Sequence, residues 1–234
     1  MFKAIKANIP NTITCLNLIS GCLACIFAFR GEETTGCLTG YESAFVFIGL
    51  AAVFDFCDGA MARLLHAYSL LGKELDSLSD LISFGLAPAL LMFNTMNGYN
   101  GCDPASYAAL AIAVCGALRL AKFNIDDRQT SSFIGLPIPA NAIFWVGTCA
   151  WIHANSYPGD TIMVILLIAI SLMMVSRLRM FSLKFKNFRI KENLRRYIII
   201  AVAIILVTVY GIPGLAWTIL AYILISALSR GNDK

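Results

Sequence analysis

Residues 55–80, DFCDGAMARLLHAYSLLGKELDSLSD, place four aspartates within a largely apolar part of the chain. Two pairs of these acids have helical spacing, three or four residues apart: Asp55 with Asp58, and Asp76 with Asp80. Each pair therefore projects from one face of a helix, with its side chains about 5–6 Å apart. Carboxylate oxygens are the ligands that Mg²⁺, Mn²⁺ and Ca²⁺ prefer. Facing pairs on neighbouring helices could hold two such cations, an arrangement that suits in-line phosphoryl displacement.

The cost of burying these acids also points to a metal. An ionised aspartate near the centre of a bilayer costs about 2.5–3.5 kcal/mol on insertion scales. The stretch offers only Arg63 and Lys73 as compensating cations for its four aspartates, so divalent metal would supply the missing positive charge. Intramembrane acids also mark ion paths, so the charges alone leave an enzyme and a divalent-cation transporter open. A transporter should spread its acids across the membrane, whereas these gather toward one side, which favours an enzyme.

The elements that must position these acids are membrane helices. The chain has 234 residues, 59% of them hydrophobic and 14% charged, whereas soluble domains are about 25% charged. A membrane-spanning helix needs roughly 17–25 residues. Apolar runs near this length fall at 12–29, 44–65, 74–97, 104–123, 137–153, 161–176, 197–211 and 213–229. The sequence predicts an all-α integral membrane protein of about eight transmembrane helices, with an uncleaved first span. Six is the alternative, because Gly211-Ile212-Pro213 splits the last pair.

The distribution of charge predicts the orientation. Most Lys and Arg lie in alternate loops and near the two ends, and the intervening loops carry acids: Glu32, Glu33, Glu42, Asp103 and Asp160. Under the positive-inside rule both termini and the aspartates face the cytoplasm. The basic segment SRLRMFSLKFKNFRIKENLRR has eight cations and one acid, Glu192. It is either a topology signal or a contact with anionic lipid headgroups. Because no soluble fold presents this segment, we exclude nucleic acid as a partner.

Written as a pattern, the acidic stretch is Asp55-x2-Asp58-Gly59-x2-Ala62-Arg63-x8-Gly72-x3-Asp76-x3-Asp80. All eight fixed positions resemble the signature of the CDP-alcohol phosphatidyltransferase family. Four further segments resemble its phosphatidylserine synthase branch: PNTITCLNLISGCLA near the N-terminus, DSLSDLISFGLAPALL at 76–91, CGALRLAKFN at 115–124 and GLPIPANA at 135–142.

This resemblance implies a reaction and a set of roles. CDP-diacylglycerol and L-serine would give phosphatidylserine and CMP at the inner face of the cell membrane. Two divalent cations, Mg²⁺ or Mn²⁺ with Ca²⁺ as a further option, would be held by Asp55, Asp58, Asp76 and Asp80. Asp80 would also be the general base, and the CDP site would be lined by Gly59, Ala62, Arg63 and Gly72.

The resemblance also implies a homodimer and a layout for the single membrane domain, 1–234. That layout has a catalytic six-helix core at 1–176, a basic cytoplasmic loop at 177–196 and a helix pair at 197–234. Within the same family, glycerol phosphate or inositol phosphate are alternative acceptors. They would need extra cations near Asp80, and the number of cations does not exclude them.

Selectivity for serine needs a cation for its carboxylate. The best candidates lie at the cytoplasmic end of the fourth span: Arg119, Lys122 and Asn124. Arg119 and Lys122 are three residues apart on one face, although Lys122 could instead extend to the membrane surface. The segment SFGLAP at 83–88 should bend or loosen the third span beside the acids. Cys37 and Cys102 both fall in loops on the outer side, where a disulfide is an open question.

Overall fold

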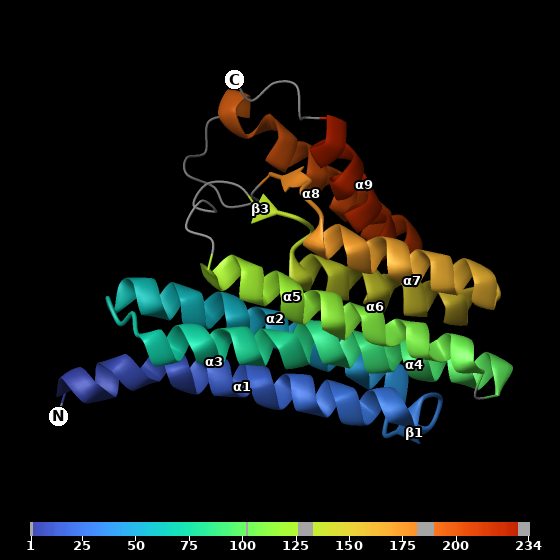
Figure 1. Ribbon diagram of the computed structural model, residues 1–234, viewed down its shortest axis with the longest axis horizontal. Coiled ribbons are helices and arrows are strands. Elements are labelled where there is room, and N and C mark those ends of the chain that lie inside the picture. The colour runs from blue at the N-terminus through green and yellow to red at the C-terminus, as the bar shows by residue number, and fades with distance from the viewer. Residues whose placement is uncertain (1, 102, 126–132, 182–189, 229–234) are drawn as a thin grey trace.

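The computed structural model describes residues 2–101, 103–125, 133–181 and 190–228. Within these ranges the chain is almost entirely helical (Figure 1). The elements in chain order are α1 (Phe2–Arg30), β1 (Thr34–Thr35), β2 (Leu38–Thr39), α2 (Gly40–Leu64), α3 (Leu70–Asp80), the π-helix η1 (Leu81–Leu86), α4 (Ala87–Asn100), the 3₁₀ helix η2 (Pro104–Ala109), α5 (Leu110–Ile125), β3 (Phe133–Ile134), α6 (Ile138–Ala154), α7 (Asp160–Val175), β4 (Arg179–Met180), α8 (Ile190–Tyr210) and α9 (Gly214–Leu228).

These elements form eight continuous helical segments in the described residues, because α3, η1 and α4 follow without a break and η2 runs directly into α5. The eight segments coincide with the eight predicted apolar runs. Among the residues that the structure describes, five helical stretches are long and apolar enough to cross a membrane: Asn8–Arg30, Gly40–Leu64, Leu70–Asn100, Pro104–Ile125 and Asn193–Tyr210. The chain thus has the character of an all-α, multi-pass membrane protein, while the number of crossings and the orientation of the termini stay predictions.

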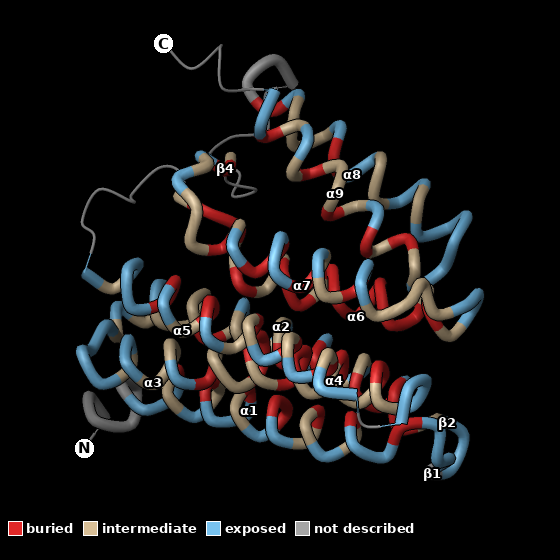
Figure 2. Tube along the Cα trace, turned by 45° about the vertical axis from the view of Figure 1, so that its right-hand side comes forward, coloured by how far each residue is buried: buried red, intermediate tan, exposed pale blue. Residues whose placement is uncertain are grey.

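Helices α1 to α7 lie in layers with their axes roughly aligned, and the α8–α9 pair is steeply inclined to them (Figure 1). Helices α1 to α5 run side by side, α6 and α7 lie over them, and the α8–α9 pair stands on the far side of α6 (Figure 1). Buried residues concentrate between the layers, and much of the outer surface is exposed (Figure 2). That outer surface is apolar: Phe56 is 72% exposed and Ile165 is 64% exposed. An apolar exterior of this kind suits surrounding lipid rather than water.

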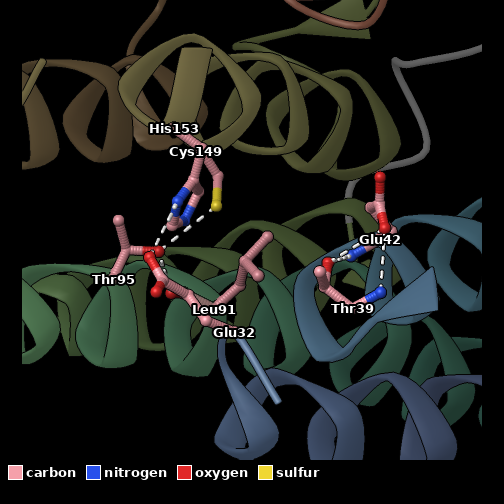
Figure 3. Close-up of polar contacts among 7 residues, drawn as sticks. All are labelled: Glu32, Thr39, Glu42, Leu91, Thr95, Cys149 and His153. Atoms are coloured by element: carbon pink, nitrogen blue, oxygen red, sulfur yellow. Dashed lines mark hydrogen bonds and ion pairs between the residues drawn. The ribbon is translucent and has the colours of Figure 1, made fainter. Parts of the chain in front are cut away.

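Polar contacts hold the end of the bundle that carries the β1–β2 hairpin. Thr39 caps α2 by accepting a hydrogen bond from the Glu42 amide at 3.2 Å, and the Glu42 carboxylate accepts one from the Thr39 amide at 2.8 Å (Figure 3). His153 Nδ1 on α6 lies 3.8 Å from a Glu32 carboxylate oxygen (Figure 3). The first pair of contacts is local to the start of α2, whereas the second links the loop after α1 to α6 at this end of the bundle.

The opposite end of α2 turns directly into α3. His66 lies in this turn with a φ of 50°, and the Ala67 amide donates to the Ala62 carbonyl at 3.0 Å. The Ser69 hydroxyl then accepts a hydrogen bond from the Gly72 amide at 2.9 Å and caps α3. So short a reversal packs the acid-bearing parts of the two helices close to each other and to α1.

The third span departs from regular α-helix where the sequence predicts loosening. Residues Leu81–Leu86 form a π-helical turn that begins directly after Asp80, with the Ala87 amide donating to the Ile82 carbonyl. Pro88 follows directly after this turn within the continuous helix, where it cannot donate the hydrogen bond that a backbone amide would give to the preceding turn. The helix continues, but with a wider turn beside the acids.

Two predictions fall partly or wholly outside the described residues. Residues 182–189 of the basic segment and Cys102 are among those that the structure does not describe. The flanking residues of the basic segment are described: β4 pairs antiparallel with β3, with Phe133 opposite Met180. A lipid-headgroup contact for the basic segment and a pairing of Cys37 with Cys102 both stay predictions.

Candidate active site

Three aspartates from two helices converge at the end of the bundle where α2 turns into α3. Asp55 on α2, and Asp76 and Asp80 on α3, each offer a carboxylate oxygen within 4.8 Å of the others. The helical spacing of the acids and the tight turn at His66 together account for this meeting. The structure thus brings together three of the four aspartates that the sequence singles out.

The fourth aspartate is held by the first helix. Asp58 is only 5% exposed, and its Oδ2 accepts a hydrogen bond from the Thr14 hydroxyl at 2.6 Å. It stands outside the group of three but lines the same cavity as Asp55 and Asp76. This short hydrogen bond holds the Asp58 carboxylate in one orientation at the cavity wall.

The first helix also supports Asp80. Asn17 donates from Nδ2 to Asp80 Oδ1 at 3.4 Å, and its own Oδ1 accepts a hydrogen bond from the Ser83 hydroxyl at 2.7 Å. Thr14 and Asn17 lie in the segment PNTITCLNLISGCLA, but the sequence alone predicted no role for them. Their signal was present: Asn11, Thr14 and Asn17 recur every three residues in α1, a spacing that places successive members on the same side of a helix.

The donor set fits a divalent cation. Asp76 Oδ1 is buried and has no hydrogen-bond partner within the described residues, although buried carboxylate oxygens nearly always have one. A cation would satisfy this oxygen together with its two neighbours. Oxygen-only ligation suits Mg²⁺, Mn²⁺ or Ca²⁺. The aspartate cluster is therefore a candidate metal centre.

A cavity of about 1100 Å³ opens over the aspartates. Its walls come from α1, α2, α3, the start of α6, and the α8–α9 pair. The polar and small residues that line it are Asn11, Thr14, Asp55, Asp58, Gly59, Ala62, Arg63, Ser69, Gly72, Lys73, Asp76 and Thr218. The apolar and aromatic ones include Phe56, Tyr68, Ile143, Ile199, Ile219 and Tyr222. A site of this volume can enclose a substrate with both a polar and an apolar part.

The small residues of the pattern differ in what they do. A methyl group added at Gly59 would meet no atom within 4 Å, so Gly59 faces open space in the cavity. A methyl group at Gly72 would lie 2.9 Å from Asn11 Oδ1, so Gly72 allows α3 to pack closely against α1. Ala62 and the exposed Arg63 line the cavity on the side of Gly59.

The three residues predicted to bind serine do not form one group. Arg119 is 8% exposed, and its Nε has no hydrogen-bond partner in the described part of the chain. Its guanidinium lies within electrostatic range of the Asp80 carboxylate. Lys122 is exposed, whereas Asn124 donates from Nδ2 to the Ser77 hydroxyl at 2.9 Å. Of the three, only Arg119 is a buried cation beside the aspartates.

Comparison with known proteins places the site in a family. The family model for CDP-alcohol phosphatidyltransferase matches residues 7–183. The chain is 39% identical to the CDP-diacylglycerol–serine O-phosphatidyltransferase of Methanocaldococcus jannaschii, over 76% of this chain and 77% of that protein. It is 36% identical to the Bacillus subtilis protein of the same name, over 77% of this chain and 91% of that protein.

A further relative, the archaetidylserine synthase of Methanothermobacter thermautotrophicus, is 31% identical over 72% of this chain and 67% of its own length. The range matched by the family model contains α1 to α7 and all four aspartates, and it ends before α8. With a match over most of its length and relatives aligned over two thirds or more of theirs, the chain belongs to the CDP-alcohol phosphatidyltransferase family.

Proposed function

We propose that this protein transfers the phosphatidyl group of CDP-diacylglycerol to the hydroxyl of L-serine, giving phosphatidylserine and CMP. The observation that carries this proposal is the convergence of Asp55, Asp76 and Asp80 at a large cavity with polar and apolar walls. Relatives that bear the name CDP-diacylglycerol–serine O-phosphatidyltransferase support serine as the acceptor. The protein is thus an enzyme of phospholipid synthesis.

The four aspartates, Asp55, Asp58, Asp76 and Asp80, are the proposed ligands of two divalent cations, Mg²⁺ or Mn²⁺, with Ca²⁺ as an alternative. When bound, such cations neutralise the diphosphate and stabilise negative charge on the transferring phosphoryl group. The hydrogen bond from Thr14 to Asp58 and that from Asn17 to Asp80 would orient these carboxylates. Such supporting contacts commonly fix the ligands of a metal site.

Asp80 is the proposed general base. Its carboxylate takes the proton of the serine hydroxyl as that oxygen forms a bond to the phosphorus on the diacylglycerol side. In the same step the bond from this phosphorus to the oxygen that bridges the two phosphates breaks. CMP leaves with the bridging oxygen, on the side opposite the attacking serine oxygen. Because serine itself is the nucleophile, no covalent intermediate with the protein is needed.

The CDP part of the substrate would lie against α2 and the start of α3. Gly59 and Ala62 leave room for the nucleotide, and Arg63 can present a planar guanidinium to the diphosphate. Gly72 shapes the opposite wall by letting α1 approach α3. The apolar residues of the cavity, such as Phe56 and Ile199, would contact the lipid chains of the substrate.

Arg119 is the proposed partner of the serine carboxylate, because it is a buried cation within electrostatic range of Asp80. Lys122 and Asn124 remain candidates for weaker contacts at the edge of the site. The exposure of Lys122 fits a side chain that extends to the membrane surface.

The setting of the reaction follows from charge. Under the positive-inside rule, the end of the bundle that carries the aspartates faces the cytoplasm, which supplies soluble serine and receives CMP. We infer a multi-pass protein of the cell membrane with both termini inside. A homodimer, as is common in the family, is part of the same proposal.

The acceptor can be tested directly with purified protein. CDP-diacylglycerol and Mn²⁺ or Mg²⁺ are supplied with serine, glycerol 3-phosphate or inositol phosphate in parallel, and CMP release is followed. We expect CMP only with serine. CMP with a phosphorylated acceptor and not with serine would contradict the proposed acceptor, and metal-dependent ion flux without CMP would favour a transporter. An ether-linked CDP-lipid in a further arm determines which lipid core is preferred.

Filling the open space at Gly59 should block the nucleotide. We expect Gly59→Leu to lower kcat/KM for CDP-diacylglycerol by about tenfold or more, because overpacking costs about 1–3 kcal/mol. The measurement is CMP release at varied CDP-diacylglycerol, with thermal unfolding in parallel. Gly49→Leu is the matched control, since Gly49 lies on the same helix, is exposed and also has open space around it. Equal activity of the two variants would contradict the assignment of Gly59 to the CDP site.

A further inference from the structure

Ser83 lies in the wide turn that follows Asp80, and it faces the first helix. It belongs to η1 and is 0% exposed. Helix α1 approaches this turn closely, because a methyl group added at Gly21 would come within 2.3 Å of the Ser83 Oγ and 2.8 Å of its Cα. This close approach leaves the Ser83 hydroxyl little room to take another position.

The partner of this hydroxyl is Asn17, which is also 0% exposed. The Ser83 hydroxyl donates to Asn17 Oδ1 at 2.7 Å and lies 3.1 Å from the main-chain oxygen of the same residue. The Asn17 Nδ2 in turn donates to Asp80 Oδ1 at 3.4 Å. Ser83, Asn17 and Asp80 thus form a chain of hydrogen bonds that runs from η1 through α1 to the proposed base.

The chemistry of these groups fixes the direction of the chain of hydrogen bonds. An ionised carboxylate only accepts hydrogen bonds, so the Asn17 amide has to present its NH₂ group to Asp80. The amide oxygen then faces Ser83, whose hydroxyl is a donor at 2.7 Å. Because the contact with Asp80 is longer, at 3.4 Å, the shorter contact with Ser83 contributes more to holding the amide in this orientation.

We propose that Ser83 is a positioning residue for the reaction: it holds the Asn17 amide in the orientation that donates to Asp80, and thereby fixes the carboxylate that takes the serine proton. Without the Ser83 hydroxyl, the buried Asn17 oxygen loses its donor and the amide can move away from Asp80. A misplaced base slows the chemical step, whereas binding of the two substrates is unaffected. This inference rests on the function proposed above, in which Asp80 is the base.

The test is Ser83→Ala, measured at saturating Mn²⁺. We expect kcat to fall about threefold to tenfold, the range that corresponds to one lost hydrogen bond, while KM for serine and KM for CDP-diacylglycerol stay unchanged. Ser79→Ala is the matched control, because Ser79 is also 0% exposed and its hydroxyl donates to α1, at the Thr14 main-chain carbonyl, at 3.3 Å. It removes a buried hydroxyl between the same two segments without affecting Asn17, so it should lower the unfolding temperature similarly and leave kcat unchanged.

A double-mutant cycle with Asn17→Ala shows whether Ser83 acts through Asn17. If it does, the double variant should have the same kcat as Asn17→Ala alone. An unchanged kcat in Ser83→Ala, an equal loss of kcat in Ser79→Ala, a rise in either KM instead of a fall in kcat, or additive effects in the cycle would each overturn the inference. Failure of the proposed function has a different signature, because the unmodified protein would then release no CMP with serine, or Asp80→Asn would turn over normally.

Discussion

Replacing Asp80 by asparagine is expected to lower turnover by at least about a hundredfold, since general-base catalysis contributes roughly 10²–10⁴-fold. The amide is close in shape to the carboxylate but cannot take the proton of the serine hydroxyl. It can still accept the hydrogen bond that Asn17 donates to Oδ1. At saturating Mn²⁺, binding of CDP-diacylglycerol should therefore be largely retained while CMP release falls.

Two measurements make this expectation specific. CMP release under saturating serine gives turnover, and equilibrium binding of CDP-diacylglycerol with and without Mn²⁺ gives the occupancy of the site. Glu74→Gln is the matched control, because Glu74 is an exposed acid on the same helix and lies outside the cavity. An Asp80→Asn variant that turns over normally would exclude Asp80 as the base.

Replacing Asp76 by asparagine should instead act on the metal. Its Oδ1 is the buried oxygen without a hydrogen-bond partner in the described residues, so it gains most from a cation. Removing one carboxylate charge weakens an oxygen-ligand site. We expect the Mn²⁺ concentration for half-maximal activity to rise by roughly tenfold or more, with activity recovering in part at high Mn²⁺.

This second result is read from metal titrations of activity and from direct Mn²⁺ binding to the purified protein. Glu33→Gln provides the comparison, because Glu33 is an exposed acid at the opposite end of the bundle. Unchanged Mn²⁺ dependence in Asp76→Asn would remove Asp76 from the ligand set. The two aspartates are thus distinguishable, one by loss of turnover at full metal occupancy and the other by loss of metal affinity.

The helices and the acid pairs were predictable because their signals are local. A continuous apolar run predicts a membrane helix by its own length, and acids three or four residues apart must share a helix face. The contacts from α1 are of another kind. Thr14 meets Asp58 across 44 residues of sequence, and Asn17 meets Asp80 across 63. The spacing of the polar residues within α1 indicates that one face of the helix is polar, but it does not indicate which residues that face contacts.

The residues predicted to bind serine could not be told apart from the sequence for the same reason. Arg119 and Lys122 are close on one helix, yet Arg119 is buried beside the aspartates and Lys122 is exposed. Which part of a helix face is covered depends on the neighbours that pack against it. Tyr222, which lines the cavity, was missed for a related reason: its partner, Phe181, lies 41 residues earlier in the chain, and an aromatic residue in an apolar span gives no sign of it.

The π-helical turn at Leu81–Leu86 changes the direction in which side chains point along the third span. Each residue of an α-helix advances the direction of its side chain by about 100°. The wide turn therefore rotates the side-chain directions of the half that packs as α4 relative to those of the half that bears Asp76 and Asp80. Each half can face its own neighbours, and a shift of the first half by one residue would turn the carboxylates of Asp76 and Asp80 away from Asp55.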